Sequence, residues 1–251
     1  MLEPKESVHT EMIVSALDWW VDAGVDVLVE DEPRVWLAAK DVPAPPTKVA
    51  ASIPAKVAPI AMPDDLPAFV DWLMQTDALS EAGPCANRVR PAGDPASDIM
   101  VIIDMPDVGD TTNGILIGGE AGQLFDKMVA ATHQLDGVER NRSTIYLASL
   151  LPGRTPGGSI DEATLAAALP ILRHHIDLVA PKKLWLMGQT VSRALLGPDA
   201  ALGQARLQIF NHNGRIMDAV VTHPPRFLLQ QPKWKKGAWD NIQTLIKGTI
   251  A

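Results

Sequence analysis

Short apolar runs recur along the chain from about residue 83 onward. The first, at 99–103, is continuous, and such a run is typical of a strand buried on both faces of a sheet. Later runs predict three further strands, at 144–151, 184–187 and 219–221. The pair Asn213–Gly214 before the last of these favours a β-hairpin, because both residue types accept the backbone of a tight turn.

Segments with apolar residues at helical spacing separate these strands. Helices are predicted at 121–132, from Ser159 onward with a break at Pro170, in a short segment ending at Leu196, and at 235–246. Ser159 and Glu162 have the spacing of a capping box, which marks a helix start. Strands and helices that alternate in this order predict a three-layer α/β/α fold around a four-stranded, mostly parallel sheet.

The N-terminal part of the chain has a different pattern. Residues 8–23 carry apolar side chains at helical spacing, and we expect a helical extension over 1–40. Six prolines between 41 and 63 exclude a helix or a central strand, so this stretch is predicted to be a semi-extended linker. A short helix over 64–76 then begins the main α/β domain, which we expect to occupy 64–251.

The composition is that of a globular protein. Of 251 residues, 47% are hydrophobic and 21% are charged, which allows one large domain with a core of ordinary size. No stretch approaches the roughly 20 apolar residues that span a bilayer, and the charged N-terminus lacks the pattern of a signal peptide. The single cysteine, Cys85, excludes an internal disulfide and fits a reducing compartment. We therefore expect a cytoplasmic monomer without membrane contacts.

The net charge of −8 argues against a general attraction to nucleic acid. A local basic strip can nevertheless contact DNA while the remaining surface is acidic. The most basic strip of the chain contains Arg226, Lys233, Lys235 and Lys236, with Phe227, Trp234 and Trp239 between and beside them.

Ligands of parallel α/β sheets bind at the carboxyl ends of the strands. The segments that follow the predicted strands are therefore the candidate sites, namely 104–119, 149–158, 188–190 and 222–236.

Four motifs occur in and around these segments. They read IDMPD at 103–107, GILIGGEAGQL at 114–124, YLASLLPGR at 146–154 and THPPRFLL at 222–229. In this order and spacing they resemble the motifs of family-4 uracil-DNA glycosylases, and the similarity covers roughly residues 83–247. The resemblance implies a DNA repair enzyme that hydrolyses the N-glycosidic bond of uracil or a related deaminated base.

The resemblance implies that Asp104, Asp110 and His223 are catalytic. Asp104 stands at a glutamate of the family, where a carboxylate steers water and favours the positive charge that develops on the sugar. Asp110 matches a second acidic position, and His223 is expected to donate to uracil O2 and stabilise the departing base anion. The alternative is that both acids are solvated loop or capping residues and that His223 is a buried or capping residue after a strand.

The resemblance also implies that Pro106, Ile117 and Ser149 bind the base. Ile117 stands where the family has an aromatic residue that stacks on uracil, and Ser149 where it has an asparagine that reads the uracil edge. An asparagine amide can pair with both O4 and N3–H, whereas a serine hydroxyl offers one donor, and isoleucine has no stacking face. These departures predict an activity that is weak, shifted to another lesion, or absent.

A DNA-binding surface is expected from Gly119, Arg226, Lys233, Lys235 and Lys236. The glycine would allow a close approach of the backbone to a phosphate, and the cations would pair with phosphates. The alternative is a solvated helix start whose aromatic neighbours pack in the core.

Family-4 enzymes hold a [4Fe–4S] cluster with four cysteines. In this chain Gly153 stands at one of those positions, another falls near Ala168, and residues around Asp77 and Ser80 stand at the first pair. Cys85 alone cannot hold a cluster, so we predict that the iron–sulfur cluster is absent and expect no metal ion.

Two functional hypotheses remain open at this point. The first is an active glycosylase, which needs His223 and at least one of the acids in a shared pocket. The second is a catalytically degenerate relative that binds DNA or a protein partner without excision. Ser149, Ile117, the expected lack of a cluster and the net charge favour it. A nucleotide-binding or hydrolase domain unrelated to DNA is disfavoured, because 104–119 contains neither GxGxxG nor GxxxxGK[ST].

Overall fold

The computed structural model of the protein describes Ser15, 61–200, Leu202 and 206–248. The chain divides into the units Met1–Val57 and Ala58–Ala251, and nearly all described residues belong to the second. Apart from Ser15 and 61–63, the predicted helical extension and the linker lie outside the described residues.

A six-stranded sheet with the strand order β1-β3-β2-β4-β6-β5 forms the centre of the second unit. Its parallel strands are β2 (Ile99–Ile103), β3 (Tyr146–Ser149), β4 (Lys183–Met187) and β6 (Arg215–Thr222). Antiparallel strands form the two edges, β1 (Ala92–Gly93) beside β3 and β5 (Gln208–His212) beside β6. The α/β class is confirmed, and the expected four-stranded sheet is corrected to six strands.

Each missed edge strand has a physical reason. β1 has 2 residues, both exposed, which is too short to show a hydrophobic period. β5 carries no continuous apolar run and forms only as one arm of the predicted hairpin with β6. The hairpin itself is confirmed: Asn213 and Gly214 have φ values of 50° and 78°, the positive pair that a type I′ turn requires.

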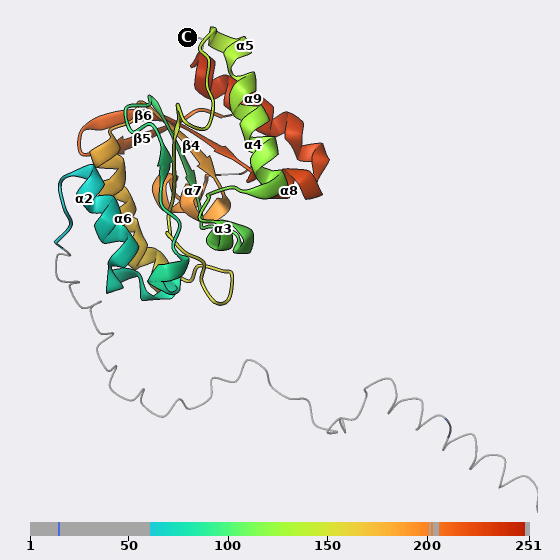
Figure 1. Ribbon diagram of the computed structural model, residues 1–251. Coiled ribbons are helices and arrows are strands. Elements are labelled where there is room, and N and C mark those ends of the chain that lie inside the picture. Colours follow the sequence, from blue (N-terminus) through green and yellow to red (C-terminus); the bar gives the residue numbers. More distant parts are fainter. Residues whose placement is uncertain (1–14, 16–60, 201, 203–205, 249–251) are drawn as a thin grey trace, which may run out of the picture. The chain divides into compact units, whose positions relative to one another are not determined.

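Helices cover both faces of the sheet (Figure 1). One face packs against α2 (Leu66–Gln75), α6 (Glu162–Val179) and α7 (Gln189–Leu196), and the other against α4 (Gly119–Ala131) and α9 (Lys235–Lys247). Alternate residues of β2 enter the two cores, Met100 and Ile102 on one side and Val101 and Ile103 on the other. Burial on both faces is the reason why this strand is continuously apolar.

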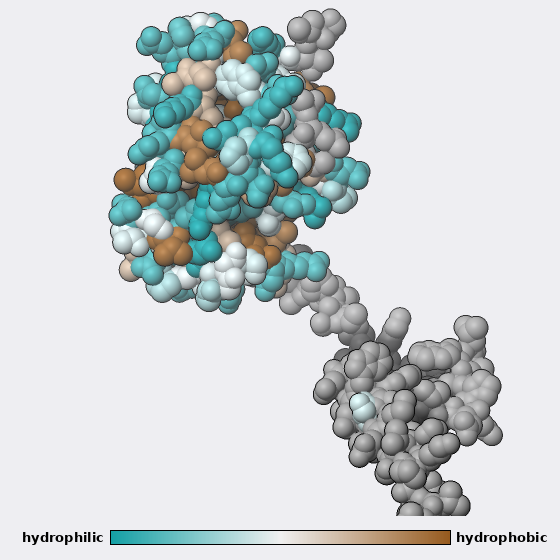
Figure 2. Space-filling model, turned by 90° about the vertical axis from the view of Figure 1, so that its right-hand side faces the viewer, coloured by the Kyte–Doolittle hydropathy of each residue, from teal (hydrophilic) through white to brown (hydrophobic). Residues whose placement is uncertain are grey.

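Short helices connect these layers. They are η1 (Asp77–Ala82), η2 (Cys85–Asn87), α3 (Val108–Asn113), α5 (His133–Asp136), α8 (Pro225–Gln230) and η3 (Pro232–Trp234). Figure 2 views the side of the molecule that carries α4, α8 and α9, where hydrophilic residues dominate and apolar residues gather in small patches. Among the described helices, none has both the length and the apolar character to cross a membrane.

Helix α6 differs from its prediction in two respects. Asp161, and not Ser159, is the N-cap, and its side chain accepts a hydrogen bond from Thr164 N at 2.8 Å. The helix also continues through Pro170 instead of breaking there. Pro170 and Ala166, whose carbonyl loses its helical partner, are both exposed, so water can solvate the freed group.

Candidate functional site

A cavity of about 240 Å³ lies at the carboxyl ends of the parallel strands. Its lining comes from the ends of β2 and β4, the loop 104–121, Arg154 and the segment 224–230. This position is where the topology of a parallel sheet places ligands. The predicted site residues that line it are Asp104, Asp110, Ile117 and Arg226.

Asp104 follows β2 directly and caps the N-terminus of α7. Its Oδ1 accepts a hydrogen bond from Val191 N at 2.7 Å. Gly188 makes this approach possible, because a Cβ on that residue would lie 2.3 Å from Asp104 Oδ2. Burial raises the pKa of Asp104, although backbone hydrogen bonds from Val191 and Thr190 act in the opposite direction. The carboxyl group is therefore held in a fixed position at the cavity wall.

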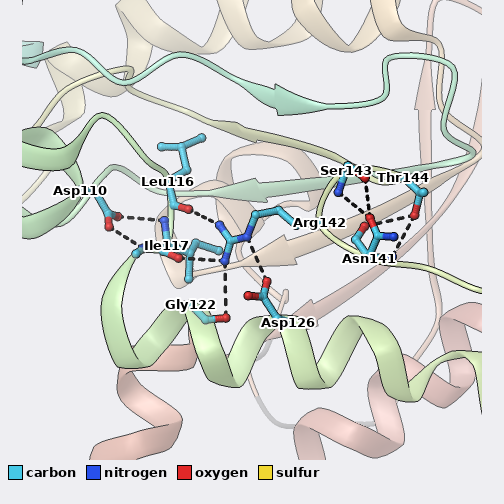
Figure 3. Close-up of polar contacts among 10 residues, drawn as sticks. Asp110, Leu116, Ile117, Gly122, Asp126, Asn141, Arg142, Ser143 and Thr144 are labelled. Atoms are coloured by element: carbon cyan, nitrogen blue, oxygen red, sulfur yellow. Dashed lines mark hydrogen bonds and ion pairs between the residues drawn. The ribbon is translucent and has the colours of Figure 1, made fainter.

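Asp110 is buried, with 4% of its surface exposed, and binds backbone N–H groups of its own loop. Its Oδ2 accepts from Ile117 N at 3.0 Å (Figure 3) and from Asp107 N at 3.1 Å. Its Oδ1 accepts from Gly118 N at 2.6 Å. These charge-assisted bonds hold the loop 107–118 in one conformation. The catalytic role of Asp110 remains a prediction.

Ile117 has a left-handed backbone with a φ of 51°, which is strained for a β-branched residue. The conformation persists because both of its backbone groups are held: Asp110 accepts from its N–H, and Arg142 Nη2 donates to its carbonyl at 3.0 Å (Figure 3). Arg142 also donates to Leu116 O at 2.6 Å and pairs with Asp126. Arg142 was missed by sequence reasoning, because it lies outside every motif and reaches the loop only through the fold.

His223 follows β6, and aromatic rings surround it. Its imidazole stacks on Phe227 with a centroid distance of 4.4 Å and lies 5.1 Å from the ring of Trp234. Its Nε2 is buried and has no hydrogen-bond partner within the described residues. Burial lowers the pKa of His223, so the imidazole is neutral at neutral pH. Phe227 lines the cavity and His223 does not, so the cavity that Asp104 and Asp110 share does not include the imidazole.

Ser149 and Pro106, the other two predicted base-binding residues, are buried, and neither lines the cavity. Ser149 ends β3 and pairs in register with Ile103 of β2. The structure therefore brings Ile117 to the cavity without bringing these two residues with it.

Two arginines converge on Asp107 at the cavity. Arg226 Nη1 lies 2.5 Å and Arg154 Nη1 lies 3.7 Å from Asp107 Oδ1. All three residues line the cavity. Arg154 and Asp107 were not among the predicted site residues, although both lie in motifs that follow strands, which was the available signal.

The rest of the predicted DNA-binding surface lies around this site. Gly119, with a φ of 59°, is exposed and lines a second cavity of about 410 Å³ that shares Asp107, Asp110 and Arg226 with the first. Lys233, Lys235 and Lys236 are exposed around the start of α9. Among the described residues, no carboxylate forms an ion pair with these lysines.

Comparison with known families adds to this geometry. The family model of the uracil DNA glycosylase superfamily matches residues 90–243, more than half of the chain. The chain belongs to this superfamily. The matched range contains every residue that lines the cavity. Uracil DNA glycosylases are in general DNA repair hydrolases, so DNA is the general class of substrate. A search of curated proteins found no match to this chain.

The residues at the cluster positions of family-4 glycosylases do not fit an iron–sulfur cluster. At Gly153, a Cβ would lie 2.0 Å from Ala82 O, so this backbone has no room for a cysteine side chain. Beside it, the buried guanidinium of Arg88 donates to the carbonyls of Leu73, Thr76 and Leu79 at 2.9–3.1 Å. These contacts tie α2 and η1 together, and the absence of a cluster remains a prediction.

Proposed function

We propose that this protein excises uracil or a related deaminated base from DNA by hydrolysing the N-glycosidic bond. The observation that carries the proposal is the cavity at the strand ends. There a partly buried acid, a strained apolar residue and a cation (Asp104, Ile117 and Arg226) line one space in a chain of this superfamily.

In this reaction, water adds to C1′ of the deoxyribose while the bond from C1′ to the base nitrogen breaks. The base leaves as an anion that then takes up a proton. Asp104 is suited to orient the water and to stabilise the developing positive charge on the sugar, because α7 fixes its carboxyl group at the cavity wall.

His223 is the candidate for stabilising the base anion. A neutral imidazole donates one N–H, and such a donor aimed at a developing anion is worth about 2.7–4 kcal/mol. Its buried Nε2 lacks a partner among the described residues, so this atom has hydrogen-bonding capacity that a bound base could use. The role requires Phe227 to turn aside when a nucleotide enters, because Phe227 stacks on the imidazole and lines the cavity.

Recognition of the base rests on few groups. Ile117 offers an apolar face and Phe227 an aromatic face to the cavity. Ser149 is not part of the lining, and its hydroxyl cannot reproduce the paired contacts of an asparagine amide. We therefore expect modest discrimination between uracil and other deaminated bases.

The test is a single-turnover assay with enzyme in excess over a labelled oligonucleotide that carries one uracil. The parent should give an alkali-labile product, and His223→Ala should lower the rate constant by about 10²–10³-fold. His133→Ala, a change at an exposed histidine, is the matched control and should leave the rate unchanged. Equal unfolding midpoints establish that the variants fold. No product from uracil or from any other deaminated base would contradict the proposal.

The second candidate is a protein that binds DNA without excision. The specific observations in its favour are that Asp110 accepts three hydrogen bonds from backbone N–H groups and that Phe227 stacks on His223. Binding of the oligonucleotide without product in the same assay would support this candidate.

A further inference from the structure

The arginines Arg154 and Arg226 share one carboxylate of the chain. Arg226 belongs to α8, Arg154 lies in the loop after β3, and Asp107 lies in the loop after β2. Their side chains are partly open to solvent, with 57%, 32% and 36% exposed, respectively. Each guanidinium carries five donors, and among the described residues Asp107 is the only side chain that pairs with either of them. The two guanidinium groups therefore have more N–H donors at the cavity than the single carboxylate can accept.

Contacts within the chain position both Arg154 and Asp107. Gly158, with a φ of 68°, leaves room for Arg154, because a Cβ on that glycine would lie 2.8 Å from Arg154 Nη2. The backbone N–H of Asp107 donates to Asp110 Oδ2 at 3.1 Å, which fixes the carboxylate side of the contact. The three groups are thus held together by two separate loops and α8.

We propose that Arg154 and Arg226 form a binding site for a backbone phosphate of DNA and that Asp107 occupies this site in the free protein. The inference rests on the proposed function for DNA as the ligand. Carboxylate and phosphate oxygens are alternative partners for a guanidinium. Asp107 keeps both arginines oriented beside the cavity, and an exposed pair of this kind is weak enough for a phosphate to displace it.

The test uses Asp107→Asn, which removes the charge and keeps a residue suited to the N-cap position of α3. The probe is a fluorescent single-stranded oligonucleotide without uracil, so that no excision takes place. At constant salt concentration we expect binding to tighten by about three- to tenfold, because phosphate no longer competes with a carboxylate.

Asp71→Asn is the matched control. Asp71, on α2, forms an exposed ion pair with Arg90 at 2.5 Å, and neither residue lines the cavity. The control variant has the same net charge as Asp107→Asn and also frees one arginine. It should change the affinity by less than about twofold, because surface charges away from the contact contribute little.

A double-mutant cycle separates a specific site from a general charge effect. In a background with Arg154→Gln and Arg226→Gln, the gain from Asp107→Asn should disappear. The inference is overturned by an equal gain in that background, by an equal gain from Asp71→Asn, by no gain at all, or by the absence of DNA binding in every variant. Equal unfolding midpoints show that the variants retain the fold.

Failure of the proposed function gives a different result. A parent that binds the oligonucleotide, responds to Asp107→Asn as expected, and excises no base refutes excision and leaves the phosphate site standing. A parent that excises uracil while Asp107→Asn leaves its DNA affinity unchanged refutes the phosphate site and leaves excision standing.

Discussion

The two segments that flank the cavity differ in whether their polar groups have partners within the chain. In the loop after β2, 104–118, the chain itself provides partners for the polar groups. Asp104 caps α7, Asp110 binds backbone N–H groups, and both backbone groups of Ile117 are held.

In the segment after β6, 223–236, several polar groups have no such partner among the described residues. The Nε2 of His223 is buried without a partner in the described part of the chain, and Lys233, Lys235 and Lys236 form no ion pair there. Trp234 is also exposed, with 38% of its surface open to solvent.

This difference distinguishes groups that fix the conformation of a loop from groups that are available to bind a ligand. A buried polar group without a hydrogen bond destabilises the fold by about 1–3 kcal/mol. Such a group suggests a partner that is not part of the chain, such as a bound ligand. A group that forms its hydrogen bonds within the chain is already explained by its contribution to the structure. His223 accordingly has an unused hydrogen-bonding atom, whereas the carboxylate of Asp110 is engaged by its own loop, although Asp110 lines the cavity and His223 does not.

The largest expected effect comes from Asp110→Asn. The new amide would point an N–H at a backbone N–H, and we expect a loss of roughly 2–4 kcal/mol in the free energy of unfolding, measured by urea titration. Asp126→Asn makes the same charge change at an exposed acid that pairs with Arg142, and it should cost less than about 1 kcal/mol. Unchanged stability together with lost excision would instead place Asp110 with the reactive groups and break the comparison.

A second prediction concerns His175, a buried histidine that, unlike His223, has a hydrogen-bond partner. His175 Nε2 lies 2.9 Å from Tyr146 Oη in the core, and burial lowers the pKa of His175 to about 3. Between about pH 6.5 and pH 3 the unfolded chain binds a proton at this residue and the folded chain does not. Stability is therefore fully present above that window and falls with acidification by roughly 1.4 kcal/mol per pH unit.

Chemical unfolding at several pH values measures this slope. His175→Gln should remove its contribution, and His133→Gln, at an exposed position, should leave the slope unchanged. A parent whose stability does not depend on pH in this window would contradict a neutral, buried His175.

A third prediction concerns the pH dependence of excision. The pKa of Asp104 is raised, so its carboxylate is lost at a higher pH than that of an exposed aspartate. Below that pKa the single-turnover rate should fall by about tenfold per pH unit. Asp104→Asn should lower the rate and abolish this acidic limb, whereas His223→Gln should lower the rate and keep it. A limb that survives in Asp104→Asn would assign the titration to another group.

The smallest effect is expected from the exposed lysines. The double change Lys235→Gln and Lys236→Gln should weaken duplex DNA binding by less than about tenfold and reduce the salt slope by about 0.9 for each lost phosphate contact. Lys182→Gln is the control, because Lys182 lies just before β4, at the end of the sheet away from the cavity. An equal loss from Lys182→Gln would show that only net charge matters.

Several features of this protein are determined by the sequence alone. The apolar runs gave the four parallel strands, because burial on both faces leaves a signal inside a single segment. The Asn213–Gly214 turn was predictable for the same local reason. The rule that ligands bind at strand ends, together with the motifs, located the cavity and four of its lining residues, Asp104, Asp110, Ile117 and Arg226.

Only the tertiary structure decided which groups those residues contact. Arg142 meets the carbonyl of Ile117 across 25 positions of the sequence, and Arg226 meets Asp107 across 119. Such contacts depend on how separate loops are placed by the sheet, and no local spacing encodes them. The unpartnered Nε2 of His223 is also a property of its surroundings, since hydrogen bonding depends on which groups the whole fold brings within about 3 Å.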